Sequence, residues 1–315
     1  MIRDDNSLAT ILLVSRMAGD EPEPLNASPF WKLVEQIGDP GDLFEMTEDD
    51  LIRAGLAGDM AARVVDLLAR SVEMAFKLER LEQSGVVTLT PFDEGYPQGW
   101  QARLGSKRPV ILHAAGAIDL LDQPGIGVVG SRNVSDEGAE VAKALGRQAA
   151  SLGLPLISGA ARGVDQLAMK AAFQAGGTVV GVPAHSLTRT LREPKVRQAL
   201  QDGLMVMCTP YAPDSPFTVG KAMGRNKLIY ALSEVTVAVS SDYGSGGTWS
   251  GATEAIRGNY CRVAVWRGNG EGPGNEPLEQ RGAQPLTDTS DLDRILEEAR
   301  SDPEQDPPPK QGALF

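Results

Sequence analysis

The residues best suited to chemistry in this sequence lie in three short segments that are rich in glycine and hydroxyl side chains. Glycine lets backbone amides approach an anion closely, hydroxyls add hydrogen-bond donors, and the dipole of a following helix favours negative charge. Such segments bind phosphate groups. Their candidate binding residues are Gly130, Ser131 and Arg132 in the first, Ser158, Gly159 and Arg162 in the second, and Ser245, Gly246, Gly247 and Thr248 in the third.

A fourth segment adds charged side chains. Arg225, Asn226 and Lys227 place two cations and an amide just ahead of a predicted helix, and we expect them to face the same crevice as the other segments. The pattern is not the dinucleotide fingerprint, because no G-x-G-x-x-G motif with an acidic residue about 20 positions later follows the first predicted strand. We therefore expect phosphate recognition without NAD chemistry and without a cofactor.

Cysteine and histidine are too scarce for a disulfide framework or a metal centre. The two cysteines, Cys208 and Cys261, are interpreted as small core residues, and the two histidines, His113 and His185, lack metal-ligand spacing. His185 is better explained as a polar loop residue than as a general base, because no partner can be assigned to it. Zinc chemistry and a His-based catalytic triad are not expected.

Charge is unevenly distributed along the 315 residues. The net charge of -12, taken alone, disfavours a nucleic-acid ligand. Residues 1–80 hold 8 Lys and Arg against 16 Asp and Glu, whereas residues 125–235 hold 12 against 8. Because a positive field concentrated in one domain suits a polyanion, the central segment is the part expected to bind one.

The elements that must position these residues follow two patterns. Over the first 84 residues, apolar side chains recur at helical spacing and predict a helix from Ser28 to Gly38, a second opened by Thr47, and a longer one from Met60 to about Gly85. Beyond them, short β-branched runs alternate with helical stretches, which indicates a parallel sheet. The runs are Ile126–Val129, Leu156–Ile157, Thr178–Val182, Leu204–Met207, Val235–Val239 and Val263–Trp266.

This alternation predicts an α/β fold: a Rossmann-like, doubly wound and mostly parallel sheet with a small N-terminal all-helical domain. The ligand site of such a sheet lies beyond the carboxyl ends of its strands, where the glycine-rich segments fall. The predicted division is a helical domain (1–84), an extended connector onto the sheet (85–124), the Rossmann-like domain (125–290), and an acidic helix with a flexible C-terminal tail (291–315). The longest early aliphatic run, Ile11–Val14, is too short to span a membrane, so we expect a cytoplasmic protein.

The four segments also occur in the order of a known family. The chain resembles the DNA-processing protein A (DprA/Smf) family, part of a Rossmann-like superfamily that includes the Lonely Guy phosphoribohydrolases. The resemblance implies a homodimer that binds single-stranded DNA, protects it from nucleases and helps to load a RecA-type recombinase in transformation, recombination or phage defence. It rests on Tyr96-Pro97, Val129 to Arg132, Ser158 to Asp165, Arg225-Asn226 and Gly246 to Thr248.

The chain departs from that family in three places. Many members carry a sterile-alpha-motif-like or helix-hairpin-helix domain at the N-terminus, but here the acidic run Asp20–Pro24 stands near the place of the Pro-Gly-Ile-Gly hairpin. We therefore do not expect the N-terminal domain to contact DNA. We expect no counterpart of the family's optional winged helix in residues 290–315, and the Ser245–Trp249 loop is closer to the divergent, defence-associated branch of the superfamily.

Two other functions compete with DNA binding. The related phosphoribohydrolases need a carboxylate beside the glycine loop to cleave a glycosidic bond, but the position three residues after Thr248 is Gly251, and Glu254 lies nearly a turn further on. A nucleotide-binding sensor without turnover is the second alternative. We expect a binding protein with no catalytic residue.

Several candidate residues also have a simpler structural explanation. Small residues between a strand and a helix can serve only close packing, and Arg162 can pair with Asp165 as an ordinary solvated ion pair. Tyr243 and Trp249 flank the third segment and can either stack on a base or pack in the core.

The C-terminal residues suggest one more partner. Residues 301–310 are acidic and proline-rich, which is typical of an extended tether. Gln311, Leu314 and Phe315 then resemble the Gln-x-x-Leu-Phe peptides by which bacterial polymerases and repair proteins dock into the sliding clamp. The alternatives are a tail that folds back onto its own domain and a tail with no role.

Overall fold

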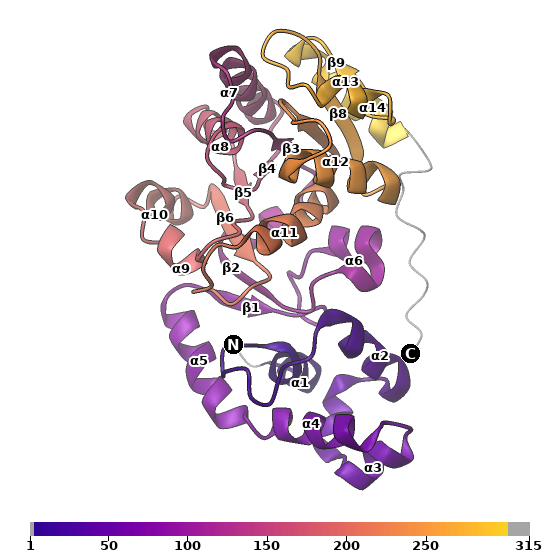
Figure 1. Ribbon diagram of the computed structural model, residues 1–315. Helices are drawn as coiled ribbons and strands as arrows, with labels where there is room; N and C mark the ends of the chain where they lie inside the picture. The colour runs from indigo at the N-terminus through magenta and orange to yellow at the C-terminus, as the bar shows by residue number, and fades with distance from the viewer. Residues whose placement is uncertain (1–2, 302–315) are drawn as a thin grey trace.

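The computed structural model describes residues 3–301, with a helical domain beside an α/β domain (Figure 1). Within this range nine strands form one sheet in the order β1-β2-β6-β5-β4-β3-β7-β8-β9. Only the β1–β2 and β2–β6 pairs of this described sheet are antiparallel, which confirms the predicted Rossmann-like, mostly parallel fold. The strands are Val87–Leu89 (β1), Leu112–Gly116 (β2), Ile126–Val129 (β3), Leu156–Ser158 (β4), Val179–Gly181 (β5), Met205–Thr209 (β6), Val235–Ala238 (β7), Arg262–Trp266 (β8) and Gln284–Leu286 (β9).

Two layers of helices cover the sheet, which is why its central strands are apolar on both faces. Side chains of α7 and α8 pack on one face, and those of α6, α11 and α12 pack on the other. A side chain at Gly146 would overlap the backbone of Ala168, so glycine allows α7 and α8 to approach closely. The helices here are Gln98–Leu104 (α6), Asp136–Ser151 (α7), Val164–Gln174 (α8), Leu187–Thr190 (α9), Pro194–Gln201 (α10), Val219–Leu232 (α11), Gly246–Gly258 (α12), Asn275–Glu279 (α13) and Leu292–Ser301 (α14).

Residues 85–124, expected to form an extended connector, instead contribute β1, β2 and α6 to the α/β domain. The two strands form the antiparallel edge of the sheet. Trp100 on α6 donates a hydrogen bond from Nε1 to the carbonyl oxygen of Leu228 at 3.0 Å, which fixes α6 on α11. β1 spans only three residues, too few to give a recognisable alternation of apolar and polar side chains.

The N-terminal domain consists of short helices around an apolar core of its own. Thr47 begins α3 with a capping box, in which its hydroxyl accepts from the Asp50 amide and the Asp50 carboxylate accepts from the Thr47 amide. The single long helix predicted from Met60 to about Gly85 is instead divided into α4 and α5, and α1 precedes the predicted elements. The helices are Asp5–Val14 (α1), Ala27–Ile37 (α2), Glu48–Arg53 (α3), Gly58–Leu68 (α4) and Ser71–Gln83 (α5).

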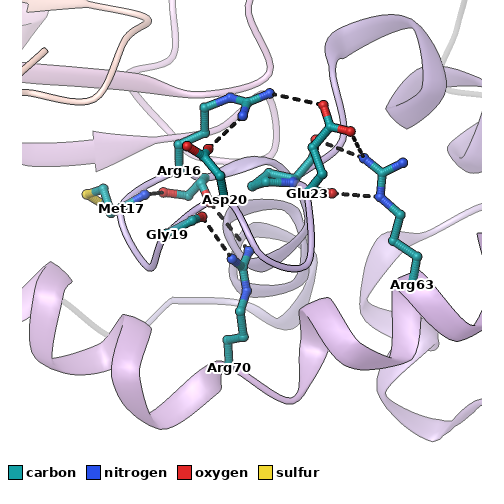
Figure 2. Close-up of polar contacts among 9 residues, drawn as sticks. Arg16, Met17, Gly19, Asp20, Glu23, Arg63 and Arg70 are labelled. Atoms are coloured by element: carbon teal, nitrogen blue, oxygen red, sulfur yellow. Dashed lines mark hydrogen bonds and ion pairs between the residues drawn. The ribbon is translucent and has the colours of Figure 1, made fainter.

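The acidic run of this domain lies in a loop that arginines hold against the helices (Figure 2). Arg16 pairs with Asp20 at 2.7 Å, and Arg63 of α4 donates to the backbone carbonyl oxygen of Glu23 at 2.6 Å. Arg70 donates to backbone carbonyl oxygens of the same loop. The loop is therefore held by ion pairs and hydrogen bonds within the domain.

The N-terminal domain is docked against the β1 edge of the sheet (Figure 1). Arg3 donates from Nη1 to the carbonyl oxygen of Thr88 in β1 at 2.7 Å. The guanidinium carbon of Arg108 lies 3.7 Å from the ring centre of Trp31 in α2, close enough for a cation–π contact. These contacts join the two domains through both a backbone group and an aromatic ring.

In the part of the chain that the structure describes, no helix is long and apolar enough to cross a membrane, and no group of three or more His, Cys, Asp or Glu side chains could hold a metal ion. The motif formed by Gln311, Leu314 and Phe315 lies outside the described residues.

Candidate functional site

A cleft of about 570 Å³ opens at the carboxyl ends of β3 and β7. From β3 the chain continues through β4, β5 and β6 on one side of the sheet, and from β7 it continues through β8 and β9 on the other. The cleft therefore lies at the topological switch point, where doubly wound folds bind their ligands. The predicted residues that line it are Gly130, Ser131, Arg132, Arg225, Asn226, Ser245, Gly246, Gly247 and Thr248.

The segment after β3 presents an exposed cation from a fixed turn. The Ser131 amide donates to the carbonyl oxygen of Ser240 at 2.9 Å, and the Val164 amide donates to the carbonyl oxygen of Ser131 at 3.2 Å. Arg132, the next residue, is exposed, and its guanidinium carbon lies 5.0 Å from the ring centre of Phe217. Because the backbone of the preceding residue, Ser131, is hydrogen-bonded to two neighbouring segments, the Arg132 side chain starts from a fixed point beside the cleft.

Two of the predicted residues in the segment after β4 differ in role: Ser158 is structural and Arg162 is exposed. Ser158 is buried and donates from Oγ to the carbonyl oxygen of Val128 at 2.6 Å, so its hydroxyl joins two strands. Arg162 is exposed and donates to Oδ1 of Asn133 at 2.7 Å. The ion pair with Asp165 that the sequence allowed as an alternative is not the contact that Arg162 makes.

Asp165 instead accepts a hydrogen bond from the Ala161 amide at 3.3 Å and is attracted by the nearby charge of Arg225. Asp165 and Arg225 are both buried, each with 5% of its surface exposed. Burial raises the pKa of Asp165, and the Arg225 cation opposes that rise. Burial likewise lowers the pKa of Arg225, against the attraction of Asp165. Nη2 of Arg225 donates to the carbonyl oxygen of Gly159 at 2.9 Å, so this cation holds the segment after β4 in place.

The prediction that Arg225, Asn226 and Lys227 stand ahead of a helix is wrong, because Thr218 caps α11 and all three lie within it. Successive residues of a helix point about 100° apart, so three neighbours cannot face one crevice. Arg225 and Asn226 line the cleft. Lys227 is half-buried near Glu254, where burial lowers its pKa and the Glu254 charge raises it, and it is not among the described residues that line the cleft.

The segment after β7 begins α12 at the cleft. The side chain of the N-cap residue, Ser245, makes no capping hydrogen bond with any described residue, and no acidic residue occupies the first turn. No carboxylate within the first turn neutralises the amides at this end of the 13-residue helix, although the Asp242 carboxylate lies close to Gly246. Asn226 donates from Nδ2 to the carbonyl oxygen of Gly247 at 2.9 Å, which links α11 to this turn. Gly246 has φ +83°, a conformation that favours glycine.

Two buried donors on the wall of the cleft also lack partners. Nε of Arg225 and the hydroxyl of Tyr230 make no hydrogen bond to any residue within the described range, although both atoms are shielded from solvent. Tyr230 is 1% exposed and lines the cleft beside Arg225. Buried polar groups are seldom left unpaired, and a water molecule, an ion or a polar ligand usually satisfies those that lack a protein partner.

A second hollow of about 330 Å³ adjoins the cleft on the β4 side. Arg162 and His185 line it, and Arg132 and Phe217 line both hollows. His185 is half-buried and hydrogen-bonded through Nε2 to Oγ1 of Thr190 at 3.0 Å, which agrees with its interpretation as a polar loop residue. Phe217 was not predicted as a site residue, since a single phenylalanine between turn residues gives no signal in the sequence.

The two aromatic residues near the third segment differ in environment. Tyr243 and Trp249 pack edge to face with ring centres 5.2 Å apart. Trp249 is 9% exposed and lies under the guanidinium of Arg281, 4.7 Å from its ring centre, whereas Tyr243 is 61% exposed. Trp249 is therefore a packing residue, and Tyr243 remains at the surface.

The two positions compared with the phosphoribohydrolases, 251 and 254, place no carboxylate in the cleft. Gly251 is buried against Tyr230 and Asn226, so a side chain there would meet both. Glu254 accepts a hydrogen bond from the Tyr260 hydroxyl at 3.2 Å and is not one of the described residues that line the cleft. Asp165 is buried beside Arg225, and Asp242 is exposed at the rim.

The family model described as DNA recombination-mediator protein A matches residues 87–298. The DNA processing protein DprA of Streptococcus pneumoniae is 32% identical over 158 residues, an alignment that covers 49% of this chain and 54% of that protein. The chain thus spans about half the length of this relative. The crystal structure of Streptococcus pneumoniae DNA processing protein A matches with a TM-score of 0.70 and 21% identity over 93% of this chain and 98% of that one. A structure that describes the single-stranded DNA binding mode of DNA processing protein A from Helicobacter pylori matches with a TM-score of 0.55 and 24% identity over 68% and 96% of the two chains.

Proposed function

Because the chain belongs to the DNA recombination-mediator protein A family, we propose that it binds single-stranded DNA in the cleft at the ends of β3 and β7. The phosphates lie against the first turn of α12 and receive hydrogen bonds from its amides and from Arg132. Arg225 acts as a positioning residue, since its guanidinium is buried, is hydrogen-bonded to Gly159 and is attracted by the charge of Asp165.

The observation that carries this proposal is the first turn of α12. Uncapped amides, an exposed arginine and two unpartnered buried donors meet at one cleft, and each of these favours an anionic or polar ligand. A single strand supplies phosphates at regular spacing and polar base edges between them. The Helicobacter pylori relative, whose binding mode for single-stranded DNA has been described, supports the same ligand class.

The salt dependence of binding tests the role of Arg132. Fluorescence anisotropy with a labelled oligonucleotide gives the slope of log K against log salt, and each phosphate contact on a single strand contributes about -0.7 to that slope. Arg132→Ala should weaken binding to every sequence alike and flatten the slope by about 0.7. Arg53→Ala, which removes an exposed cation on the N-terminal domain, is the matched control and should change neither quantity. An unchanged slope in Arg132→Ala would remove this residue from the interface.

The resemblance to the DprA/Smf family supports three further parts of the proposal. The chain forms a homodimer, it protects bound DNA from nucleases, and it delivers the strand to a RecA-type recombinase. Sedimentation with and without oligonucleotide tests the dimer, and digestion of a bound strand by an exonuclease tests protection. Loading is tested by the rate at which a RecA-type protein displaces a single-strand-binding protein. If this displacement rate is the same with and without the chain, the loading role is contradicted.

The C-terminal motif supports a sliding clamp as an additional partner. Deletion of residues 311–315 should abolish co-elution with the clamp and leave oligonucleotide affinity unchanged. Full-length protein that shows no clamp binding at tens of micromolar, roughly the range of short peptide motifs, would refute this partner.

A further inference from the structure

Phe217 stands at the boundary between the cleft and the second hollow. It is 44% exposed and lines both, a position that it shares with Arg132. An exposed aromatic ring beside a cationic groove is the arrangement on which single-strand-binding proteins stack bases, because every base offers a π-face whatever its sequence. Phe217 contributes little to the core, so its position beside the cleft favours a role in ligand binding over a role in folding.

The backbone on both sides of Phe217 is fixed. Thr218 accepts a hydrogen bond at Oγ1 from the Lys221 amide at 3.1 Å and so begins α11 directly after Phe217. Lys221 also donates from Nζ to the carbonyl oxygen of Pro216 at 3.1 Å. The ring is therefore presented by the rigid start of a 14-residue helix. A stacking surface that is already ordered loses less entropy when a base binds.

Phe217 also orders the guanidinium of Arg132, which lies over its ring. The N–H donors of a guanidinium lie in the plane of the group, so a ring that covers one face leaves their hydrogen bonds available. Arg132 can thus stay on the ring and donate to a phosphate at the same time. Phe217 and Arg132 combine an apolar surface for a base with donors for the phosphate beside it.

We propose that Phe217 and Arg132 form a nucleotide platform on which one base of the strand stacks while Arg132 binds an adjacent phosphate. The strand then crosses from the cleft into the second hollow over this platform, with bases contributing to affinity without regard to sequence. This inference rests on the proposed binding of single-stranded DNA and specifies how consecutive nucleotides are held.

Comparison of a base-bearing strand with a strand that lacks bases tests the platform. Anisotropy is measured with labelled oligo-dT and with an abasic deoxyribose-phosphate oligonucleotide of equal length. Wild-type protein should prefer oligo-dT by about tenfold, which corresponds to one stacked base. Phe217→Ala should lose that preference while retaining most of its affinity for the abasic strand, and Phe217→Trp should keep the preference. Phe76→Ala is the matched control, because Phe76 is an exposed aromatic residue on α5 that lines neither hollow within the described chain.

The outcomes of this experiment test base stacking on Phe217 separately from the binding of single-stranded DNA in the cleft. Equal losses for both oligonucleotides in Phe217→Ala would mean that the ring only aligns Arg132, and an unchanged preference would mean that no base contacts it. Either result overturns base stacking and leaves the proposed DNA-binding site standing. Failure of the wild-type protein to bind either oligonucleotide would refute the proposed function as well.

Discussion

The guanidinium of Arg225 occupies the space that a side chain at position 159 would need. Its Nη2 donates to the Gly159 carbonyl oxygen at 2.9 Å, and a Cβ built on Gly159 would overlap the guanidinium. Glycine at 159 and arginine at 225 are therefore a matched pair, in which the absence of one side chain admits the other. The segment after β4 takes its shape from this pair, and Arg225 lines the cleft although only 5% of its surface is exposed.

The first prediction is that Arg225→Ala destabilises the fold. The change leaves Asp165 buried without its cation, and breaking a buried charge pair in this way costs about 3 kcal/mol of the free energy of unfolding. Urea denaturation measures that loss. Asp165→Asn added to Arg225→Ala removes the unpaired charge and should restore part of the stability. A double variant no more stable than Arg225→Ala would show that the charge of Asp165 is not what Arg225 balances.

The second prediction concerns Gly247 in the first turn of α12. A Cβ at this position would lie 3.2 Å from Nδ2 of Asn226, whose hydrogen bond to the Gly247 carbonyl oxygen links α11 to the turn. Gly247→Val should lower oligonucleotide affinity at least about tenfold, since its side chain also covers the amides offered to phosphate. Gly58→Val in α4, where a Cβ meets nothing within 4 Å, is the matched control. A folded Gly247→Val variant with native affinity would contradict the placement of phosphate at this turn.

The third prediction separates binding from catalysis. Glu254→Gln retains an acceptor for the Tyr260 hydroxyl and leaves the cleft lining unchanged, so DNA affinity should equal that of the wild type. Chromatography of nucleoside monophosphates incubated with wild-type protein should detect no released base. Release by the wild type that disappears in Glu254→Gln would favour the phosphoribohydrolase alternative.

The fourth prediction concerns stability in acid. His113 is buried in β2, with Nδ1 hydrogen-bonded to Oγ1 of Thr88 at 3.0 Å. Burial, aided by the nearby Arg3 cation, lowers its pKa to about 3. Below pH 6.5 the unfolded chain gains a proton at this residue that the folded chain does not accept, so the free energy of unfolding falls as the pH falls from about 6.5 towards 3.

The contribution of His113 to this acid sensitivity is about 2 kcal/mol at pH 5. His113→Asn removes the titrating group, so the difference in stability between wild type and variant should shrink by about that amount between pH 7.5 and pH 5. Urea denaturation of both proteins at the two pH values measures the change. A difference that does not vary with pH would show that His113 titrates in the folded state near its usual pKa.

The sequence predicts the central sheet well because its strands are buried on both faces. Each β-branched run from Ile126 to Trp266 coincides with a strand, since a covered parallel strand has no polar position to break the run. β1 and β9, at the two edges of the described sheet, have the sequences Val-Thr-Leu and Gln-Pro-Leu, so they contain no continuous apolar run. Residues 130, 131 and 245–248 are placed at the cleft because the carboxyl ends of parallel strands meet at one edge of the sheet.

The side-chain arrangement of the site could not be predicted to the same degree. The hydrogen bond from Arg225 to Gly159 joins residues 66 positions apart, and no local pattern encodes such a contact. The orientation of Lys227 depends on where α11 begins, which Thr218 decides nine residues earlier. The role proposed for Phe217 depends on its contact with Arg132 and on its position between two hollows, and neither can be predicted from the sequence.

The hydrogen bond from Arg3 to the Thr88 carbonyl oxygen also affects how sheets could associate. An exposed edge strand offers unpaired backbone groups to which a strand of another chain can add, and such addition leads to continuous sheets and aggregation. Here the side chain of Arg3 is hydrogen-bonded to the Thr88 carbonyl oxygen of the edge strand β1, and the helical domain is docked against that edge. The sheet is therefore protected from extension at β1, and any backbone pairing between two copies would have to begin at β9, the opposite edge of the described sheet.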